Sequence, residues 1–84
     1  MPIFAPEAEF SEEARRQKYS GVCIVSIVVD VHGIPHQPRI LRSLGMGLDE
    51  KAVEAVLRYR FKPGTLRGRP VATQVQVYIN FRMF

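Results

Sequence analysis

The chain has 84 residues, enough for one domain and too few for a second. Its 46% hydrophobic and 24% charged residues exclude a disordered chain, and no apolar run approaches the roughly 18–20 residues that a membrane span requires. The net charge is +4, and no acid occurs between residues 55 and 84. This asymmetry suggests a surface that attracts an anionic partner, although a solvated basic face is the simpler interpretation of charge alone.

The first ten residues, 1–10, are expected to form an extended lead-in from an upstream linker to a domain spanning 11–84. Pro2 and Pro6 disfavour a helix in this segment. The segment also lacks the basic region and the apolar block of a signal peptide. The chain is therefore either cytosolic or a fragment whose targeting segment lies upstream.

A short helix is expected over residues 11–19. Ser11 is a suitable N-cap, acidic residues occupy the first turn, and basic residues occupy the last turn. This order of charges complements the helix dipole, and Gly21 marks the stop.

Residues 22–31 give the clearest strand pattern. Alternate positions from Cys23 to Val31 are all apolar, and the other face is interrupted only by Ser26 and Asp30. A strand that is apolar on both faces is usually central in its sheet. Cys23, the sole cysteine, is therefore expected to be buried, unpaired and unreactive.

A tight turn at residues 30–33, in which Gly33 supplies a positive φ, is predicted to reverse the chain. The returning strand, about 37–43, is poorer, because Pro35 and Pro38 stand before and within it. Proline cannot donate a backbone hydrogen bond, so this strand is expected at an edge of the sheet.

The second helix begins at Leu48 and is ended by the Lys-Pro-Gly sequence at 62–64. Apolar residues recur at helical spacing on one of its faces: Leu48, Ala52, Val53, Val56, Leu57 and Phe61. A basic loop then runs to Pro70. From residue 71 to 84 apolar and polar residues alternate almost without exception, which predicts a long strand with one buried and one solvated face.

These elements give the order α-β-β-α-β, an α+β fold. With the apolar first strand in the middle, the sheet is three-stranded and antiparallel in the order 2-1-3, and two helices pack on one face. The last strand is then an exposed edge. It carries a single arginine and no proline after Pro70, so it lacks the usual defences of an edge against pairing with another chain.

Seven stretches, in this order along the chain, resemble the TonB C-terminal domain family. They are SEEAR (11–15), GVCIVSIVVD (21–30), SLGMGLDE (43–50), AVEAV (52–56), YRFKP (59–63), GRPV (68–71) and INF (79–81). The resemblance covers about residues 7–84. The aromatic-x-aromatic-x-Pro pattern at 59–63 is its most specific part.

The resemblance implies a periplasmic domain, anchored to the inner membrane by an N-terminal transmembrane helix and a proline-rich linker that lie upstream. It implies two kinds of partner, namely outer-membrane TonB-dependent transporters and the proton-driven motor proteins of the inner membrane. In the family, a short box peptide of the transporter adds as a strand beside the last strand of the domain, and the segment before the first helix also contacts the transporter. The implied function is to couple proton motive force to the uptake of siderophores or other nutrients.

Matched by position, the resemblance assigns the peptide-pairing strand to Thr73, Gln74, Val75, Gln76, Val77, Tyr78 and Ile79. The pre-helix contact falls on Glu7, Glu9, Phe10 and Ser11, where Phe10-Ser11 replaces the Tyr-Pro of the family. Arg67 and Arg69 are expected to steer an acidic peptide toward the strand, mainly by raising the association rate. The open last strand also predicts weak homodimers through strand pairing.

No catalytic, cofactor or metal site is expected from the sequence. Gly45 and Gly47 precede a helix but lack the rest of a phosphate-binding motif. His32 and His36 have no further ligand at metal-binding spacing, and Cys23 points into the expected core. Two alternatives stay open. The first is the same module appended to a membrane sensor or protease-like protein, and the second is a small basic RNA-binding domain. The RNA alternative is the weaker one, because the central strand offers no aromatic residues for base stacking.

Overall fold

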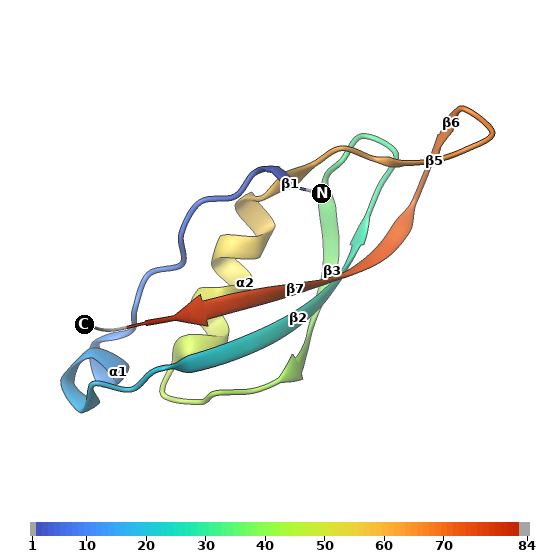
Figure 1. Ribbon diagram of the computed structural model, residues 1–84. Coiled ribbons are helices and arrows are strands. Elements are labelled where there is room, and N and C mark those ends of the chain that lie inside the picture. The colour runs from blue at the N-terminus through green and yellow to red at the C-terminus, as the bar shows by residue number, and fades with distance from the viewer. Residues whose placement is uncertain (1, 83–84) are drawn as a thin grey trace.

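The computed structural model describes residues 2–82 and is shown in Figure 1. Its elements, in chain order, are β1 (Pro2–Phe4), α1 (Glu12–Gln17), β2 (Gly21–Val29), β3 (Pro35–Arg42), α2 (Leu48–Arg58), β4 (Arg60–Phe61), β5 (Gly64–Leu66), β6 (Arg69–Val71) and β7 (Thr73–Phe81). Within this range no helix is long and apolar enough to cross a membrane.

The central sheet has three antiparallel strands in the order β3-β2-β7, so the predicted strand order is confirmed. β2 lies in the middle and pairs with β7 along its whole length, from Gly21↔Phe81 to Val29↔Thr73. Figure 1 shows α2 crossing one face of this sheet, and α1 adds Ala14 to the same core. Among the residues described, no helix covers the opposite face, which we call the open face.

The core lies between the sheet and the helices. Its buried apolar side chains come from both helices, β2, β4 and β7: Ala14, Cys23, Val25, Ile27, Val29, Leu48, Ala52, Val56, Phe61, Ile79 and Phe81. The alternation in β2 accounts for four of these positions. Cys23 is fully buried and unpaired, as predicted. Burying a large aliphatic or aromatic side chain stabilises a fold by about 1.5–3 kcal/mol, so this layer holds the molecule together.

The helix α2 is shorter than its apolar pattern predicts. It ends at Arg58, because Tyr59 adopts an extended backbone (φ −63°, ψ 152°). Phe61 therefore reaches the core from β4 and not from the helix. Pro63 lies just beyond, where a proline favours extended backbone before it.

The buried stripe of α2 is rotated slightly from the predicted one. Ala55 is buried, whereas Val53 is only half-buried and Leu57 is exposed. The small Ala55 side chain suits close contact, so the stripe follows packing distance as well as hydrophobicity.

The helix α1 is also shorter than predicted, although its cap is the expected one. Ser11 Oγ accepts a hydrogen bond from Ala14 N–H at 3.1 Å. Lys18 then adopts a left-handed backbone (φ 52°) and ends the helix, so residues 18 and 19 lie outside it.

The long strand predicted over 71–84 is divided in two. Only β7 joins the central sheet, while β6 pairs with β5 in a separate hairpin. The predicted basic loop is therefore partly a hairpin, with a tight turn at Arg67 and Gly68, both of which have a positive φ. Residues 83 and 84 of the predicted strand lie outside the described residues.

The lead-in contains a strand that the sequence did not predict. β1 pairs with β4, with Pro2 opposite Phe61 and Phe4 opposite Arg60. The rest of the lead-in runs without regular structure to α1, along the molecule as Figure 1 shows.

Candidate functional site

The edge of β7 that faces away from β2 has no neighbouring strand in the described part of the chain. β7 contains no proline and no charged residue, and it pairs with β2 without a bulge. The opposite edge strand differs, because β3 contains Pro35 and Pro38 and its register shifts twice. Prolines and bulges hinder the pairing of an edge with another chain, so β7 is the edge that remains open to an added strand.

The direction of the backbone groups in β7 follows from the neighbouring hairpin. Asp30 N–H donates to Ile34 O at 3.0 Å, so Asp30 directs its backbone toward β3. Backbone groups alternate in direction along a strand, and those of Val29 therefore point toward β7, where Thr73 is the register partner. The position of Pro35 supports this assignment. Pro35 stands opposite Val29 in a non-hydrogen-bonded pair, where the missing N–H of proline costs no hydrogen bond.

The odd-numbered residues of β7 thus bond to β2, and the even-numbered residues direct their backbone N–H and C=O groups outward. The outward residues are Gln74, Gln76, Tyr78 and Asn80. Proline at position 74 therefore removes an outward N–H and leaves the hydrogen bonds between β7 and β2 intact. Proline at position 75 would remove one of those bonds.

The side chains of the predicted pairing strand divide between the two faces of the sheet. Those on the helix-covered face are half-buried or buried: Thr73, Val75, Val77 and Ile79. Those on the open face are exposed: Gln74, Gln76 and Tyr78. Tyr78 is 64% exposed, which makes it the largest free apolar surface on the strand.

A groove of about 400 Å³ lies between the carboxyl-terminal half of β7 and the lead-in. Its lining comes from the lead-in, from the segment after α2, and from β7 with the residue that follows it: Ala5, Pro6, Glu7, Ala8, Phe10, Tyr59, Tyr78, Ile79, Asn80 and Arg82. Tyr78 and Asn80 are outward-facing residues of β7, so a strand added to this edge meets the groove at its end.

The structure brings two of the four predicted pre-helix residues to this groove. Glu7 lines it with an exposed side chain, and Phe10 lines it while its ring packs edge-on against Phe81, with centroids 5.5 Å apart. Ser11 is occupied as the cap of α1, and its hydroxyl donates to Met46 O. Glu9 lies instead beside α2, in a shallow hollow.

Six lining residues were not among the predicted site residues: Ala5, Pro6, Ala8, Tyr59, Asn80 and Arg82. Asn80 and Arg82 continue the alternation of the strand, so the pattern itself was a usable signal for them. Tyr59 carries no such signal, because it reaches the groove only through the bend after α2. Burial raises the pKa of the Tyr59 hydroxyl above its ordinary value.

Arg67 and Arg69 lie away from this groove, on the hairpin of β5 and β6. Figure 1 shows the hairpin projecting beyond the sheet, at the end of the molecule opposite the one toward which β7 runs. Both arginines are exposed, as is Leu66, the last residue of β5. They can act on a partner of β7 through charge at a distance, but not by lining the groove.

Cys23 and Asp49 make a contact between β2 and the first turn of α2. The Cys23 thiol lies 3.6 Å from Asp49 Oδ1, and burial, followed by this carboxylate, raises its pKa to about 11. Partial burial favours the neutral form of Asp49, but donors from Ser43, Leu44 and Gly45 together hold the pKa of its carboxyl below the ordinary value. A buried, protonated thiol is a poor nucleophile. The contact instead links β2 to α2, while the hydrogen bonds from Ser43, Leu44 and Gly45 tie the 43–45 loop to the same carboxylate.

Residues 6–83 match the family described as the Gram-negative bacterial TonB protein C-terminal. The chain is also similar to "Protein TonB" of Vibrio cholerae serotype O1, with 32% identity over 71 residues. This alignment covers 83% of the chain and 29% of that protein, so the chain spans less than a third of this relative.

The fold is similar to that in the solution NMR structure of the Pseudomonas aeruginosa TonB CTD. The TM-score is 0.79 at 20% sequence identity, and the match covers 99% of this chain and 85% of that chain. At this identity the similarity concerns the fold alone. Because the family match extends over nearly the whole chain, the protein belongs to the TonB C-terminal domain family, as its motifs predicted.

Proposed function

We propose that the chain is the periplasmic domain of a TonB-type energy transducer, and that it binds the box peptide of outer-membrane TonB-dependent transporters. The domain belongs to a transport-related family and not to a family of enzymes. The observation that carries the proposal is the open outer edge of β7. Anchored to the inner membrane by an upstream segment and driven there by proton-powered motor proteins, the domain pulls on the peptide and so couples proton motive force to nutrient uptake.

The peptide binds by strand addition to β7. Gln74, Gln76, Tyr78 and Asn80 offer outward N–H and C=O groups in regular register, so an extended peptide pairs without any rearrangement of the sheet. Each backbone hydrogen bond contributes about 0.5–1.5 kcal/mol net, so several in a row give useful affinity. The backbone provides this affinity, and the neighbouring side chains on each face select the peptide sequence.

The groove beside β7 holds one end of the bound peptide. Glu7 on one wall and Arg82 on the other offer opposite charges, and Tyr59 and Tyr78 offer aromatic surface. These side chains come from segments far apart in the sequence, so the lead-in contributes to recognition only when it is folded against β7.

A proline scan of the edge tests the proposal. Gln74→Pro removes an outward N–H and is expected to abolish peptide binding while the fold persists. Gln74→Ala is the matched control, because it removes only the side chain and its 3.2 Å hydrogen bond to Ser26 Oγ, and it is expected to bind. Val75→Pro deletes a donor to β2 and is expected to destabilise the domain itself.

Binding is measured by NMR titration of the labelled chain with box peptides from the transporters of the same organism. The proposal expects the amides of residues 73–79 to shift, and high concentrations of the free chain to show weak homodimers that peptide dissociates. If no box peptide perturbs these amides, or if single-stranded RNA perturbs them instead, the proposed function is wrong.

A further inference from the structure

The open face of the sheet carries basic side chains along β3. The register pairs Ile24↔Arg42, Ser26↔Arg39 and Val28↔His36 place two arginines and a histidine of β3 on this face. β7 adds amide side chains and Tyr78, and Arg82 follows the strand. The nearby carboxylate, Asp30, is already engaged, with its Oδ2 atom 2.7 Å from His36 Nε2. The face therefore presents positive charge without a carboxylate left over to balance it.

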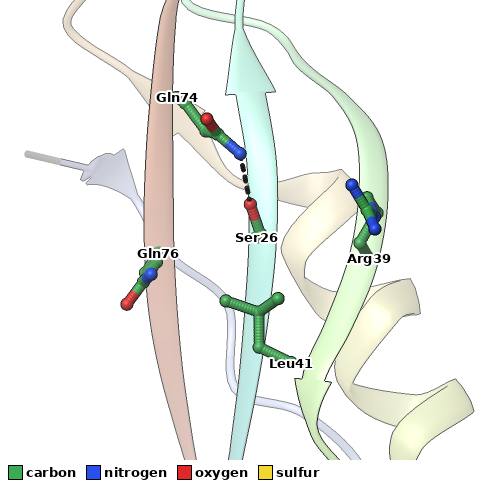
Figure 2. Close-up of a pocket in the computed structure, with 5 residues that line it drawn as sticks. All are labelled: Ser26, Arg39, Leu41, Gln74 and Gln76. Carbon is green, nitrogen blue, oxygen red and sulfur yellow. Dashed lines mark hydrogen bonds between the residues drawn. The ribbon is translucent and has the colours of Figure 1, made fainter.

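A recess of about 370 Å³ lies on this face. Figure 2 shows the five residues that line it. Its floor is the small side chain of Ser26, which is only 4% exposed, and its walls are Arg39, Leu41, Gln74 and Gln76. Ser26 Oγ accepts a hydrogen bond from Gln74 Nε2, and the hydroxyl proton of Ser26 has no acceptor among the described residues. Within the same residues, Arg39 has no ion-pair partner.

The walls of the recess combine donors with apolar surface. Arg39, the Ser26 hydroxyl and the two glutamine amides can all donate hydrogen bonds to an acceptor placed between them. Leu41 is 51% exposed and leans over the recess in Figure 2. Such an arrangement fits a carboxylate on an aliphatic stem, which is the side chain of glutamate or aspartate.

We propose that the open face is a second docking surface, which receives an acidic patch on the folded part of the same transporter, with a carboxylate seated in the recess beside Arg39. The inference rests on the proposed function, because that function supplies the partner. A protein fits better than RNA, because β2 and β3 offer Leu41 and the half-buried Val22, Ile24 and Val28 to a partner and no aromatic ring for base stacking.

The recess and the outer edge of β7 are adjacent but separable. Gln74 and Gln76 belong to both, so a strand added to β7 extends the open face on which the partner sits. Arg39 and Leu41 belong to β3, on the far side of β2, about 10 Å from β7 at the usual spacing between strands. Changes at these two residues therefore affect the open face without touching the peptide edge.

Two variants, Arg39→Glu and Leu41→Glu, test the inference against two probes. The probes are a synthetic box peptide and the intact transporter from which it comes, in detergent micelles. Both variants are expected to weaken binding of the transporter about tenfold, a loss that shrinks at high salt, and to leave peptide affinity within about twofold. Arg16→Glu makes the same change of charge as Arg39→Glu on α1, outside the open face, and is expected to alter neither.

The possible results separate the inference from the function beneath it. If both variants bind the transporter as the wild type does, the inference is overturned and the proposed function stands. If the wild type binds no box peptide, the proposed function fails first and the inference fails with it. If Arg39→Glu loses affinity for single-stranded RNA and not for the transporter, the face binds nucleic acid and the inference is wrong. Leu41→Glu keeps the test decisive if Arg39→Glu does not fold.

Discussion

Gly33 joins the tip of the β2–β3 hairpin to β4. Its N–H donates to Asp30 O and its carbonyl accepts from Phe61 N–H, both at 3.0 Å. Its φ is +81°, and a Cβ atom at this position would lie 2.0 Å from Phe61 O. We expect Gly33→Ala to lower the free energy of unfolding by about 2–4 kcal/mol, because backbone strain adds to a clash with main-chain atoms. Urea unfolding followed by circular dichroism measures this loss.

Gly68 provides the control for this substitution. It also has a positive φ, of +78°, but a Cβ atom there would meet nothing within 4 Å. Gly68→Ala is therefore expected to cost only the strain, about 1 kcal/mol. Equal losses in the two variants would contradict the role given to the contact with Phe61.

Asp30 makes the stability of the hairpin depend on pH. Hydrogen bonds from Ile34 N–H first and His36 second lower its pKa from 3.8 to about 2. A carboxyl whose pKa is lowered by folding contributes stability above its unfolded value, and this contribution is lost as the pH falls from about 4 to about 2. Thermal unfolding of Asp30→Asn is therefore expected to depend less on pH in this window than that of the wild type. Parallel curves for the two proteins would count against this account.

At the scale of elements, the sequence was most informative where a side-chain pattern ran for many residues. The two-sided apolar pattern of 22–31 predicted a central strand, which also placed the last strand at an edge. The alternation after residue 71 predicted a strand with one buried and one solvated face. All three features are confirmed for β2 and β7. Short elements escaped prediction, because β1, β4, β5 and β6 are held by pairing with other segments and not by their own periodicity. The groove could not be predicted from the sequence either, because its walls come from the lead-in and from β7, which are far apart along the chain.

The two ends of the lead-in differ in how closely they pack against the rest of the molecule. All three residues of β1 are exposed, whereas Phe10 packs against Phe81. Deleting residues 1–4 is therefore expected to change the melting temperature little, and Phe10→Ala is expected to cost about 1–3 kcal/mol. Differential scanning calorimetry of the two variants measures both effects. A large loss from the deletion would show that β1 is part of the cooperative fold.

The β5–β6 hairpin, at one end of the molecule, carries two exposed arginines and no acidic residue. Reversing Arg67 and Arg69 to Glu is expected to slow association with an acidic box peptide several-fold and to weaken its dependence on salt. Dissociation and melting temperature are expected to stay the same, because both side chains are exposed and form no ion pair within the described residues. Stopped-flow measurements of the association and dissociation rates, at salt concentrations from about 0.05 M to about 0.5 M, test this expectation. Loss of a direct contact would instead speed dissociation.

The pairing of β1 with β4 acts as a release point when the molecule is pulled from its amino end. It comprises two register pairs, whereas β2 and β7 pair along their full length. A force applied between the amino end and a peptide held on β7 therefore detaches β1 first. The freed lead-in can then span at most about 3.3–3.6 Å per residue, and the load reaches Phe10 and its contact with Phe81 only when this length is taken up. The lead-in is therefore expected to extend at the start of a pull, before tension reaches the central sheet.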